Sequence, residues 1–346
     1  GSRLSHVIDL CVSTHCAVQV LSDPQSVGAG APQQGAFREL NTADFLSRDE
    51  VTLDTDQISG YLTGKTVLVT GGGGSIGSEL CRQVMRFHPG KLLIFDIYEN
   101  CAYELLMELQ QKYGREIPVT VLIGSIRDKK RLDEVFETYH PTVVFHAAAH
   151  KHVPLMEVSP AEAVKNNVLG TKNLLVSASG HGVERFVQLS TDKAVNPTSV
   201  MGCTKRICEM LIQTFAGNTD MKCVAVRFGN VLGSHGSVIP LFEAQIKKGG
   251  PVTLTDPNIE RYFMTIPEAA QLVLQAGALA ESGNIYVLDM GEPVKIMDLA
   301  KQLIRFYGYE PGVNMEIRIV GLRPGEKLYE ELMMDEEQDK MRRTQH

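Results

Sequence analysis

Four consecutive glycines, Gly71–Gly74, constrain the fold of this chain more than any other stretch of it. They follow an apolar run, Thr66–Thr70, and precede a segment, Ser75–Phe87, whose apolar residues recur at helical spacing. A tight turn from a strand into a helix needs backbone angles that glycine adopts without strain. With Gly77 the run gives the spacing G-x-x-G-x-x-G, so the sequence predicts a strand, a glycine turn and a helix.

The alternation of strand and helix continues beyond this turn. Short runs rich in Val, Ile and Leu alternate with helical segments, which is typical of parallel β-α-β units with helices on both faces. The sequence therefore predicts a Rossmann-type α/β fold, a doubly wound parallel sheet with a smaller C-terminal cap. The predicted strands are Thr66–Thr70, Lys91–Phe95, Val119–Ile123, Val143–His146, Arg185–Leu189 and Lys222–Val226, and the predicted helices are Ser75–Phe87, Glu99–Tyr113, Lys129–Tyr139, Ala161–Ser179 and Val200–Ala216.

Three regions are predicted along the 346 residues. Residues 1–40 are interpreted as a tag remnant, the tail of an upstream module and a Ser-, Pro- and Gly-rich linker. Residues 41–227 are predicted to form the sheet domain, with a lead-in to about residue 64. Residues 228–346 are predicted to form mainly the cap, with some segments that return to the sheet, because the alternation loosens after Arg227.

Composition excludes several classes of protein. The chain is 43% hydrophobic and 22% charged, as in a globular protein with a large core. Its formal net charge of −7 argues against an extended nucleic-acid surface. Seven cysteines without a C-x-x-C pair argue against a disulfide framework or a thiolate zinc site. We predict no metal site, since His146, His150 and His152 have no acidic or thiolate partner at suitable spacing.

The glycine turn also predicts a ligand. Without Cβ atoms the turn lets a pyrophosphate approach the backbone, and the N-terminus of the following helix attracts its negative charge. Asp96 ends the second predicted strand, 19 residues after Gly77. A carboxylate there accepts hydrogen bonds from a ribose diol and repels a 2′-phosphate, so NAD is favoured over NADP. Arg127, beyond the third strand, could still tolerate a phosphate.

Further motifs, in order along the chain, resemble those of the extended short-chain dehydrogenases/reductases. Together they resemble most closely the C5-retaining, membrane-type UDP-N-acetylglucosamine 4,6-dehydratases of bacterial polysaccharide and protein-glycosylation pathways. The resemblance covers about residue 41 to the C-terminus. The motifs are Phe145–Glu157 (FHAAAHKHVPLME), Asn167–Thr171 (NVLGT), Ser190–Lys193 (STDK), Met201–Lys205 (MGCTK), Arg227–Ser234 (RFGNVLGS), Glu260–Thr265 (ERYFMT) and Arg323–Glu331 (RPGEKLYEE).

This resemblance implies an NAD-dependent lyase that acts on UDP-N-acetylglucosamine or a close UDP-N-acetyl sugar. The implied reaction oxidises C4, eliminates water across C5 and C6, and returns the hydride to C6, with retention at C5. The resemblance also implies a homodimer or higher homo-oligomer. From the net charge we predict no nucleic-acid partner. Full-length members carry transmembrane helices before the catalytic domain, so the whole protein is expected at the cytoplasmic membrane with that domain in the cytoplasm.

The segment Thr191-Asp192-Lys193 is expected at the end of the fifth strand. The resemblance implies that Asp192 is the acid for the C6 hydroxyl and that Lys193 is the base at C5. It also implies that Thr191 hydrogen-bonds the C4 oxygen. A lysine base must lose its proton first, so burial or a nearby positive charge such as Lys151 is expected to favour the neutral amine.

Met201 departs from the Tyr-x-x-x-Lys pattern of the superfamily, whose tyrosine removes the proton of the hydroxyl being oxidised. A thioether cannot take that proton, which leaves an inactive relative or an enzyme that uses another group. Retaining dehydratases include members with methionine here, so the resemblance favours an active enzyme. Thr191 with a water, or Asp192, would then take the C4 proton. Lys205 is expected to bind the nicotinamide ribose.

The resemblance also assigns the other site residues. Ser125 stands where relatives place an aspartate against the adenine, and Asp128 nearby is a candidate to compensate. Forked guanidinium groups suit a diphosphate, which favours the two arginines of the cap motifs. The predicted cofactor-binding residues are Gly71, Gly74, Ser75, Ile76, Gly77, Asp96, Ser125, Ile126, Ala147 and Lys205, and the predicted substrate-binding residues are Lys151, Asn167, Asn230, Arg261, Arg323 and Glu326.

Two other functions stay open at this point. A nucleotide-sugar 4-epimerase would share the fold and the cofactor but would need neither Asp192 nor Lys193. A non-catalytic NAD-binding regulatory protein is compatible with the missing tyrosine at position 201.

Overall fold

The computed structural model describes residues 19–21, 37–39, 53–234 and 236–342. Most of the region 1–40, interpreted above as a tag remnant, an upstream tail and a linker, lies outside these ranges. Within it, the short strands β1 (Gln19–Leu21) and β2 (Phe37–Glu39) pair antiparallel. None of the helices in the described ranges combines the length and apolar character that a membrane crossing requires. The membrane anchor implied by the resemblance stays a prediction.

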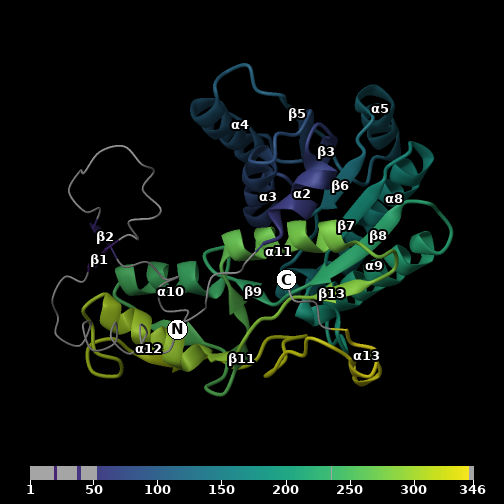
Figure 1. Cartoon of the computed structure of the whole chain (residues 1–346). Helices are drawn as coiled ribbons and strands as arrows, with labels where there is room; N and C mark the ends of the chain where they lie inside the picture. The colour runs from purple at the N-terminus through teal and green to yellow at the C-terminus, as the bar shows by residue number, and fades with distance from the viewer. Residues whose placement is uncertain (1–18, 22–36, 40–52, 235, 343–346) are drawn as a thin grey trace.

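A seven-stranded parallel sheet lies at the centre of the molecule, in the order β13-β8-β7-β6-β3-β4-β5 (Figure 1). The predicted α/β fold is confirmed. The strand order reverses at β3, whose neighbours are β4 and β6, and open sheets bind ligands at the carboxyl ends beside such a switch point. The strands are β3 (Thr66–Thr70), β4 (Lys91–Asp96), β5 (Val119–Ile123), β6 (Val143–His146), β7 (Arg185–Leu189), β8 (Lys222–Arg227) and β13 (Ile285–Val287).

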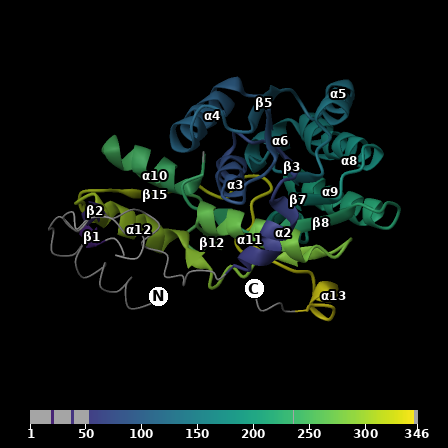
Figure 2. The same ribbon diagram turned by 45° about the horizontal axis from the view of Figure 1, so that its top comes forward.

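Helices cover both faces of the sheet (Figures 1 and 2). Successive side chains of a strand point to opposite faces, so Val67 and Val69 of β3 enter one core while Leu68 enters the other. The first core is closed by α2 (Thr55–Leu62), α3 (Ser75–Met85), α4 (Glu99–Tyr113) and α11 (Ile266–Leu279), and the second by α5 (Lys129–Tyr139), α8 (Gly170–Gly180) and α9 (Val200–Ala216).

The predicted helix over residues 161–179 is wrong in its geometry. The chain there forms α7 (Pro160–Ala163), a π-helical segment η3 (Val164–Leu169) and then α8. Asn167 explains the difference, because its buried amide group bridges to a neighbouring loop and helix. Its Oδ1 accepts a hydrogen bond from the backbone N–H of His150 at 2.8 Å, and its Nδ2 donates to Oγ1 of Thr204 at 3.0 Å. Such π-turns often occur at functional sites.

The cap packs around its own core of apolar side chains from α10, α12 and β10. It lies beside the sheet domain in both ribbon views (Figures 1 and 2). Two segments from the C-terminal half, α11 and β13, belong to the sheet domain instead. The cap consists of β9 (Asn230–Val231), α10 (Val238–Lys247), β10 (Val252–Leu254), β11 (Glu260–Arg261), β12 (Phe263–Met264), β14 (Val294–Lys295), α12 (Ile296–Phe306) and β15 (Ile317–Ile319).

Candidate active site

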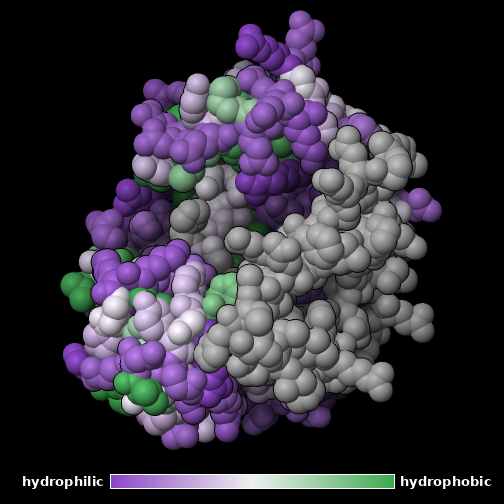
Figure 3. Space-filling model, turned by 90° about the vertical axis from the view of Figure 1, so that its left-hand side faces the viewer, coloured by the Kyte–Doolittle hydropathy of each residue, from purple (hydrophilic) through white to green (hydrophobic). Residues whose placement is uncertain are grey.

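A cavity of about 730 Å³ lies where the carboxyl ends of β3, β6 and β7 meet the cap. A second cavity, of about 450 Å³, adjoins it beyond the glycine turn. Figure 3 shows the surface hollowed between the upper and lower parts of the molecule. Of the predicted site residues, the larger cavity is lined by Gly71, Gly74, Ser75, Ile76, Gly77, Ala147, Lys151, Thr191, Lys193, Met201, Lys205, Asn230, Arg261, Arg323 and Glu326, and the smaller by Gly71, Gly74, Asp96, Ser125, Ile126 and Ala147.

Two predicted site residues, Asp192 and Asn167, line neither cavity and lie behind the walls. Asp192 is fully buried beneath Thr191 and Lys193, and Asn167 is 1% exposed within η3. Asn167 therefore fixes the loop at His150 rather than presenting its own side chain to the cavity.

The glycine turn is packed so closely that side chains would not fit. Gly71 has φ +67°, and a Cβ there would come within 2.6 Å of the backbone nitrogen of Ala148. A Cβ on Gly77 would collide with the carbonyl oxygen of Gly71. Gly74 is the N-cap of α3 and itself carries no side chain that could cap the helix. The first residues of α3 line the cavity, so the N-terminal dipole of the helix faces it. The turn can accept a phosphate against its backbone.

Backbone N–H groups fix the carboxylate of Asp96 at the end of β4. Its Oδ2 accepts a hydrogen bond from the N–H of Gly73 at 2.8 Å, and its Oδ1 accepts one from the N–H of Tyr98 at 2.9 Å. Asp96 and Ser125 both line the smaller cavity. Asp128 does not line it, because its carboxylate caps α5 by accepting a hydrogen bond from the N–H of Arg131 at 3.0 Å. The suggestion that Asp128 compensates for Ser125 at the adenine therefore finds no support.

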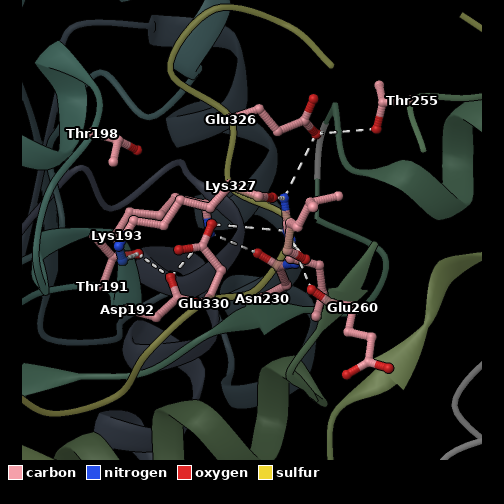
Figure 4. A network of polar contacts seen from close by, with 12 residues as sticks. Thr191, Asp192, Lys193, Thr198, Asn230, Thr255, Glu260, Glu326, Lys327 and Glu330 are labelled. Atoms are coloured by element: carbon pink, nitrogen blue, oxygen red, sulfur yellow. Dashed lines mark hydrogen bonds and ion pairs between the residues drawn. The ribbon is translucent and has the colours of Figure 1, made fainter. Parts of the chain in front are cut away.

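The loop after β7 carries a hydrogen-bonded set of polar groups (Figure 4). Asp192 begins the short helix η4 (Asp192–Ala194). Its Oδ1 accepts hydrogen bonds from Oγ1 of Thr191 at 2.8 Å and from Nζ of Lys193 at 3.0 Å. The same Nζ donates to Oδ1 of Asn230 at 3.3 Å. An amine and a carboxyl group in direct contact at a cavity wall are suited to moving protons.

The charged groups that contact Lys193 are negative. Besides Asp192, the carboxylate of Glu330 lies 3.7 Å from Nζ of Lys193. The expected positive neighbour is therefore not among its contacts in the described ranges. Lys151 does line the cavity, where partial loss of solvent lowers the pKa of its amine.

Glu330 is the residue of this site that the sequence reasoning missed. Burial raises the pKa of its carboxyl, which Lys193 and Arg261 oppose and Asp192 reinforces. Its Oε2 has no hydrogen-bond partner among the described residues, and neither does Oδ2 of Asp192. Its signal in the sequence was its position inside the motif Arg323–Glu331. From that motif, only Arg323 and Glu326 were predicted as substrate-binding residues.

Met201 and Lys205 lie one turn apart on α9, and both line the cavity. Met201 is 3% exposed and packs against Met156, so position 201 supplies apolar surface and no proton acceptor. Nζ of Lys205 donates to the carbonyl oxygen of Leu189 at 2.6 Å. Burial lowers the pKa of Lys205, although Glu209 partly opposes this.

The two arginines of the cap motifs differ in what they contact. The guanidinium of Arg261 is almost buried and donates to the carbonyl oxygens of Glu260 and Lys327, each at 2.7 Å. Arg323 is 56% exposed at the cavity mouth and pairs with Glu326 at 3.4 Å. Arg261 thus holds the C-terminal segment in place as well as lining the cavity, and the predicted diphosphate contacts stay predictions.

His146 is held between two hydroxyl groups beneath the cavity. Nδ1 lies 2.7 Å from Oγ1 of Thr70, and Nε2 lies 2.9 Å from Oγ1 of Thr171. Burial, with Lys205 nearby, lowers the pKa of His146 to about 3, so the ring is neutral at neutral pH. It joins β3, β6 and α8. The described part of the chain contains no group of three His, Cys, Asp or Glu side chains that could hold a metal ion.

The sequence matches the family described as "Polysaccharide biosynthesis protein" over residues 67–346. It is 52% identical over 323 residues, 93% of the chain, to "Probable polysaccharide biosynthesis protein EpsC" of Bacillus subtilis, and 52% identical over 332 residues, 96% of the chain, to "Capsular polysaccharide biosynthesis protein CapD" of Staphylococcus aureus. The chain spans about half of each relative, 54% and 55%. A "UDP-N-acetylglucosamine 4,6-dehydratase (inverting)" of Campylobacter jejuni is 33% identical over 77% of the chain and 76% of its own length.

Two solved structures show the same fold. Pen from Bacillus thuringiensis matches with a TM-score of 0.74 and 36% identity, over 80% of this chain and 85% of that one. UDP-glucose 4-epimerase from Thermus thermophilus, solved with NAD, matches with a TM-score of 0.65 and 25% identity, over 75% and 88%. The chain therefore belongs to the polysaccharide biosynthesis protein family and has the fold of the extended short-chain dehydrogenases/reductases.

Proposed function

We propose that this protein catalyses the NAD-dependent 4,6-dehydration of UDP-N-acetylglucosamine with retention at C5, in the synthesis of sugars for surface polysaccharides or glycoproteins. The observation that carries the proposal is the contact of 3.0 Å between Nζ of Lys193 and Oδ1 of Asp192 at the cavity wall. An elimination needs such a base and acid, whereas a 4-epimerase needs neither. The dehydratase relative from Campylobacter jejuni supports the same reaction class.

The residues around the glycine turn fit NAD. The cradle at Gly71 and Gly77 leaves no room for side chains, which suits a pyrophosphate against the backbone. Asp96, held by two N–H groups, presents acceptors for a ribose diol at the smaller cavity. Lys205 at the larger cavity would bind the nicotinamide ribose. NAD, when bound, supplies the hydride acceptor for C4 and the hydride donor for C6.

Three residues, Thr191, Asp192 and Lys193, can carry out all the proton transfers that the reaction needs. Thr191 lies between the cavity and Asp192, so the C4 hydroxyl would pass its proton through Oγ1 of Thr191 to the Asp192 carboxylate. This route makes a proton acceptor at position 201 unnecessary. Neutral Lys193 then removes the C5 proton, and the proton held by Asp192 returns through Thr191 to the C6 hydroxyl, which leaves as water.

Retention at C5 follows when the same amine returns the proton. Lys193 leaves the elimination as an ammonium group on one face of the sugar, and it would protonate C5 from that face after C6 is reduced. Asp192 ends ionised and Lys193 ends neutral, as they began. One base on one face gives retention, whereas inversion would require a second acid on the opposite face.

The test is incubation with UDP-N-acetylglucosamine and NAD in D₂O, followed by NMR of the sugar. We expect a 6-deoxy-4-keto product that carries deuterium at C5 and keeps the gluco configuration there. An inverted C5 would rule out retention, and a galacto product would identify a 4-epimerase. Bound NAD without any turnover would favour a regulatory protein.

We also propose that the protein forms a homo-oligomer through α8 and α9. Exposed side chains at helical spacing on α9, namely Cys203, Ile207 and Met210, form an apolar stripe. Val176 on the neighbouring α8 is 42% exposed. Burial of such a face against a second copy would remove this apolar surface from water.

A further inference from the structure

Glu330 has no role in the reaction as proposed, yet its carboxylate lies 3.7 Å from Nζ of the base Lys193 (Figure 4). Its side chain is 3% exposed, and its Oε2 has no hydrogen-bond partner among the described residues. It also lines the larger cavity. A carboxylate so close to an amine in a poorly solvated site affects where that amine holds its proton.

The segment that carries Glu330, residues 323–331, is fastened to both sides of the cavity, so the carboxylate cannot simply swing away. We call it the C-terminal strap. Its contacts join it to β11 of the cap and to the loop that follows η4. They are the hydrogen bonds from Arg261 to the carbonyl oxygens of Lys327 and Leu328 (2.7 and 3.1 Å), from Lys327 to that of Val195 (2.9 Å), from Thr198 to that of Gly325 (3.3 Å), and from Asn196 to Oε1 of Glu331 (3.0 Å).

Four charged groups face Glu330. Lys193 and Asp192 lie on η4, Arg261 lies on β11 with Nε at 3.9 Å, and Lys327 lies on the strap itself. Burial raises the pKa of Glu330 and the three cations oppose this, while Asp192 adds to it. The carboxyl of Glu330 therefore keeps its proton to a higher pH than the carboxyl of an exposed glutamate does.

We propose that Glu330 is a positioning residue that sets the pH at which Lys193 releases its proton and becomes a base. When Glu330 is ionised, its charge stabilises the ammonium form and holds Nζ beside Asp192. When Glu330 is neutral or absent, Lys193 releases its proton at lower pH. The effect on the amine stands on geometry alone, whereas its consequence for turnover rests on the proposed function.

The experiment measures the reactivity of Lys193 in the whole protein without substrate. Acetic anhydride acetylates an amine only in its neutral form. Mass spectrometry of the peptide that contains Lys193 then gives the acetylated fraction of Lys193 at each pH. In Glu330→Gln we expect the midpoint of the curve of acetylated fraction against pH to fall by about 1–3 pH units, the effect of one charge about 4 Å away between the dielectric constant of bulk water and an effective value of about 20. Glu331→Gln is the matched control, because that neighbour contacts Lys327 and Asn196 and should leave the midpoint in place.

Turnover gives the second measurement. In Glu330→Gln the acid limb of the pH profile of kcat should move to lower pH by the same amount, with KM little changed. An unmoved midpoint overturns the proposal, and so does a uniform loss of kcat at every pH without a shift of the limb. If wild-type protein does not convert UDP-N-acetylglucosamine, the proposed function fails, but the modification midpoints still decide the role of Glu330.

Discussion

Lys193 is the side chain on which the proposed elimination depends most directly, since it both removes and returns the C5 proton. In Lys193→Ala we expect turnover of UDP-N-acetylglucosamine to fall by about 10²–10⁴-fold, the usual contribution of a general base. NAD affinity should be unchanged, because the glycine turn and Asp96 do not contact Lys193 in the described structure. NMR of the product and calorimetry of NAD binding check the two expectations.

Lys222→Ala is the control for charge alone, since Lys222 is exposed at the start of β8, the opposite end of the sheet from the cavity. Turnover in Lys193→Ala equal to that of this control would remove Lys193 from the mechanism.

Single residues also show why part of this site could be predicted and part could not. The motif placed Thr191, Asp192 and Lys193 on one loop, and local sequence is enough for that. The role of Glu330 depends on a contact of 3.7 Å between segments far apart in the chain, which no local pattern reports. Likewise, the carbonyl oxygens of Lys327 and Leu328, which accept hydrogen bonds from the guanidinium of Arg261, belong to a distant segment. The role of Arg261 in holding that segment was therefore not visible in the sequence.

At the scale of elements, the six predicted strands agree with the structure to within one residue at their ends, because each is a short run rich in Val, Ile and Leu. The strand β13 was missed because it has only three residues, whereas β5 at the other edge of the sheet has five. The π-helical segment η3 was missed because its extra residue per turn barely alters the spacing of apolar positions, and its cause is the bridge made by Asn167 to another loop.

The apolar stripe on α9 leads to a prediction about assembly. Ile207 is 41% exposed at its centre, and Ile207→Glu would place a charge in the proposed contact with a second copy. We expect the mass in solution, measured by light scattering after size-exclusion chromatography, to fall to that of the monomer. Val313→Glu changes an 82% exposed residue on the cap and should leave the mass unchanged. A monomeric wild-type protein would contradict the proposed oligomer.

At the scale of the whole molecule, a buried charge cluster ties the C-terminal end to the sheet. Arg227 at the end of β8 is fully buried between two carboxylates, Glu209 on α9 at 2.8 Å and Glu337 on the short helix α13 (Asp335–Gln338) at 2.7 Å. Glu209 also accepts a hydrogen bond from Oγ of Ser190 at 2.7 Å, next to the segment Thr191-Asp192-Lys193. The cluster thus fixes the chain that follows the C-terminal strap and supports the position of Glu330.

This cluster should make stability depend on pH in a defined direction. Burial is the largest single influence and raises the pKa of Glu337, but the hydrogen bonds from Arg227 and from the backbone N–H of Met334, with the positive charges of Arg227 and Arg206, together outweigh it. The folded protein therefore holds this pKa below the usual value. A carboxyl with a lowered folded pKa stabilises the protein above its unfolded pKa of about 4.3, and this contribution disappears as pH falls through the folded value.

We expect Glu337→Gln to lose about 1–2 kcal/mol of unfolding free energy at pH 7, or about 2–6 °C in Tm by calorimetry. The difference from wild type should shrink below about pH 4. Glu336→Gln, an exposed neighbour on α13, should differ little from wild type at either pH. Acidification protonates Glu337 and removes the ion pair from the wild-type protein, whereas Glu337→Gln has no such ion pair to lose. If the variant were less stable than wild type by the same unfolding free energy at low and at neutral pH, the ionised carboxylate would not stabilise the fold.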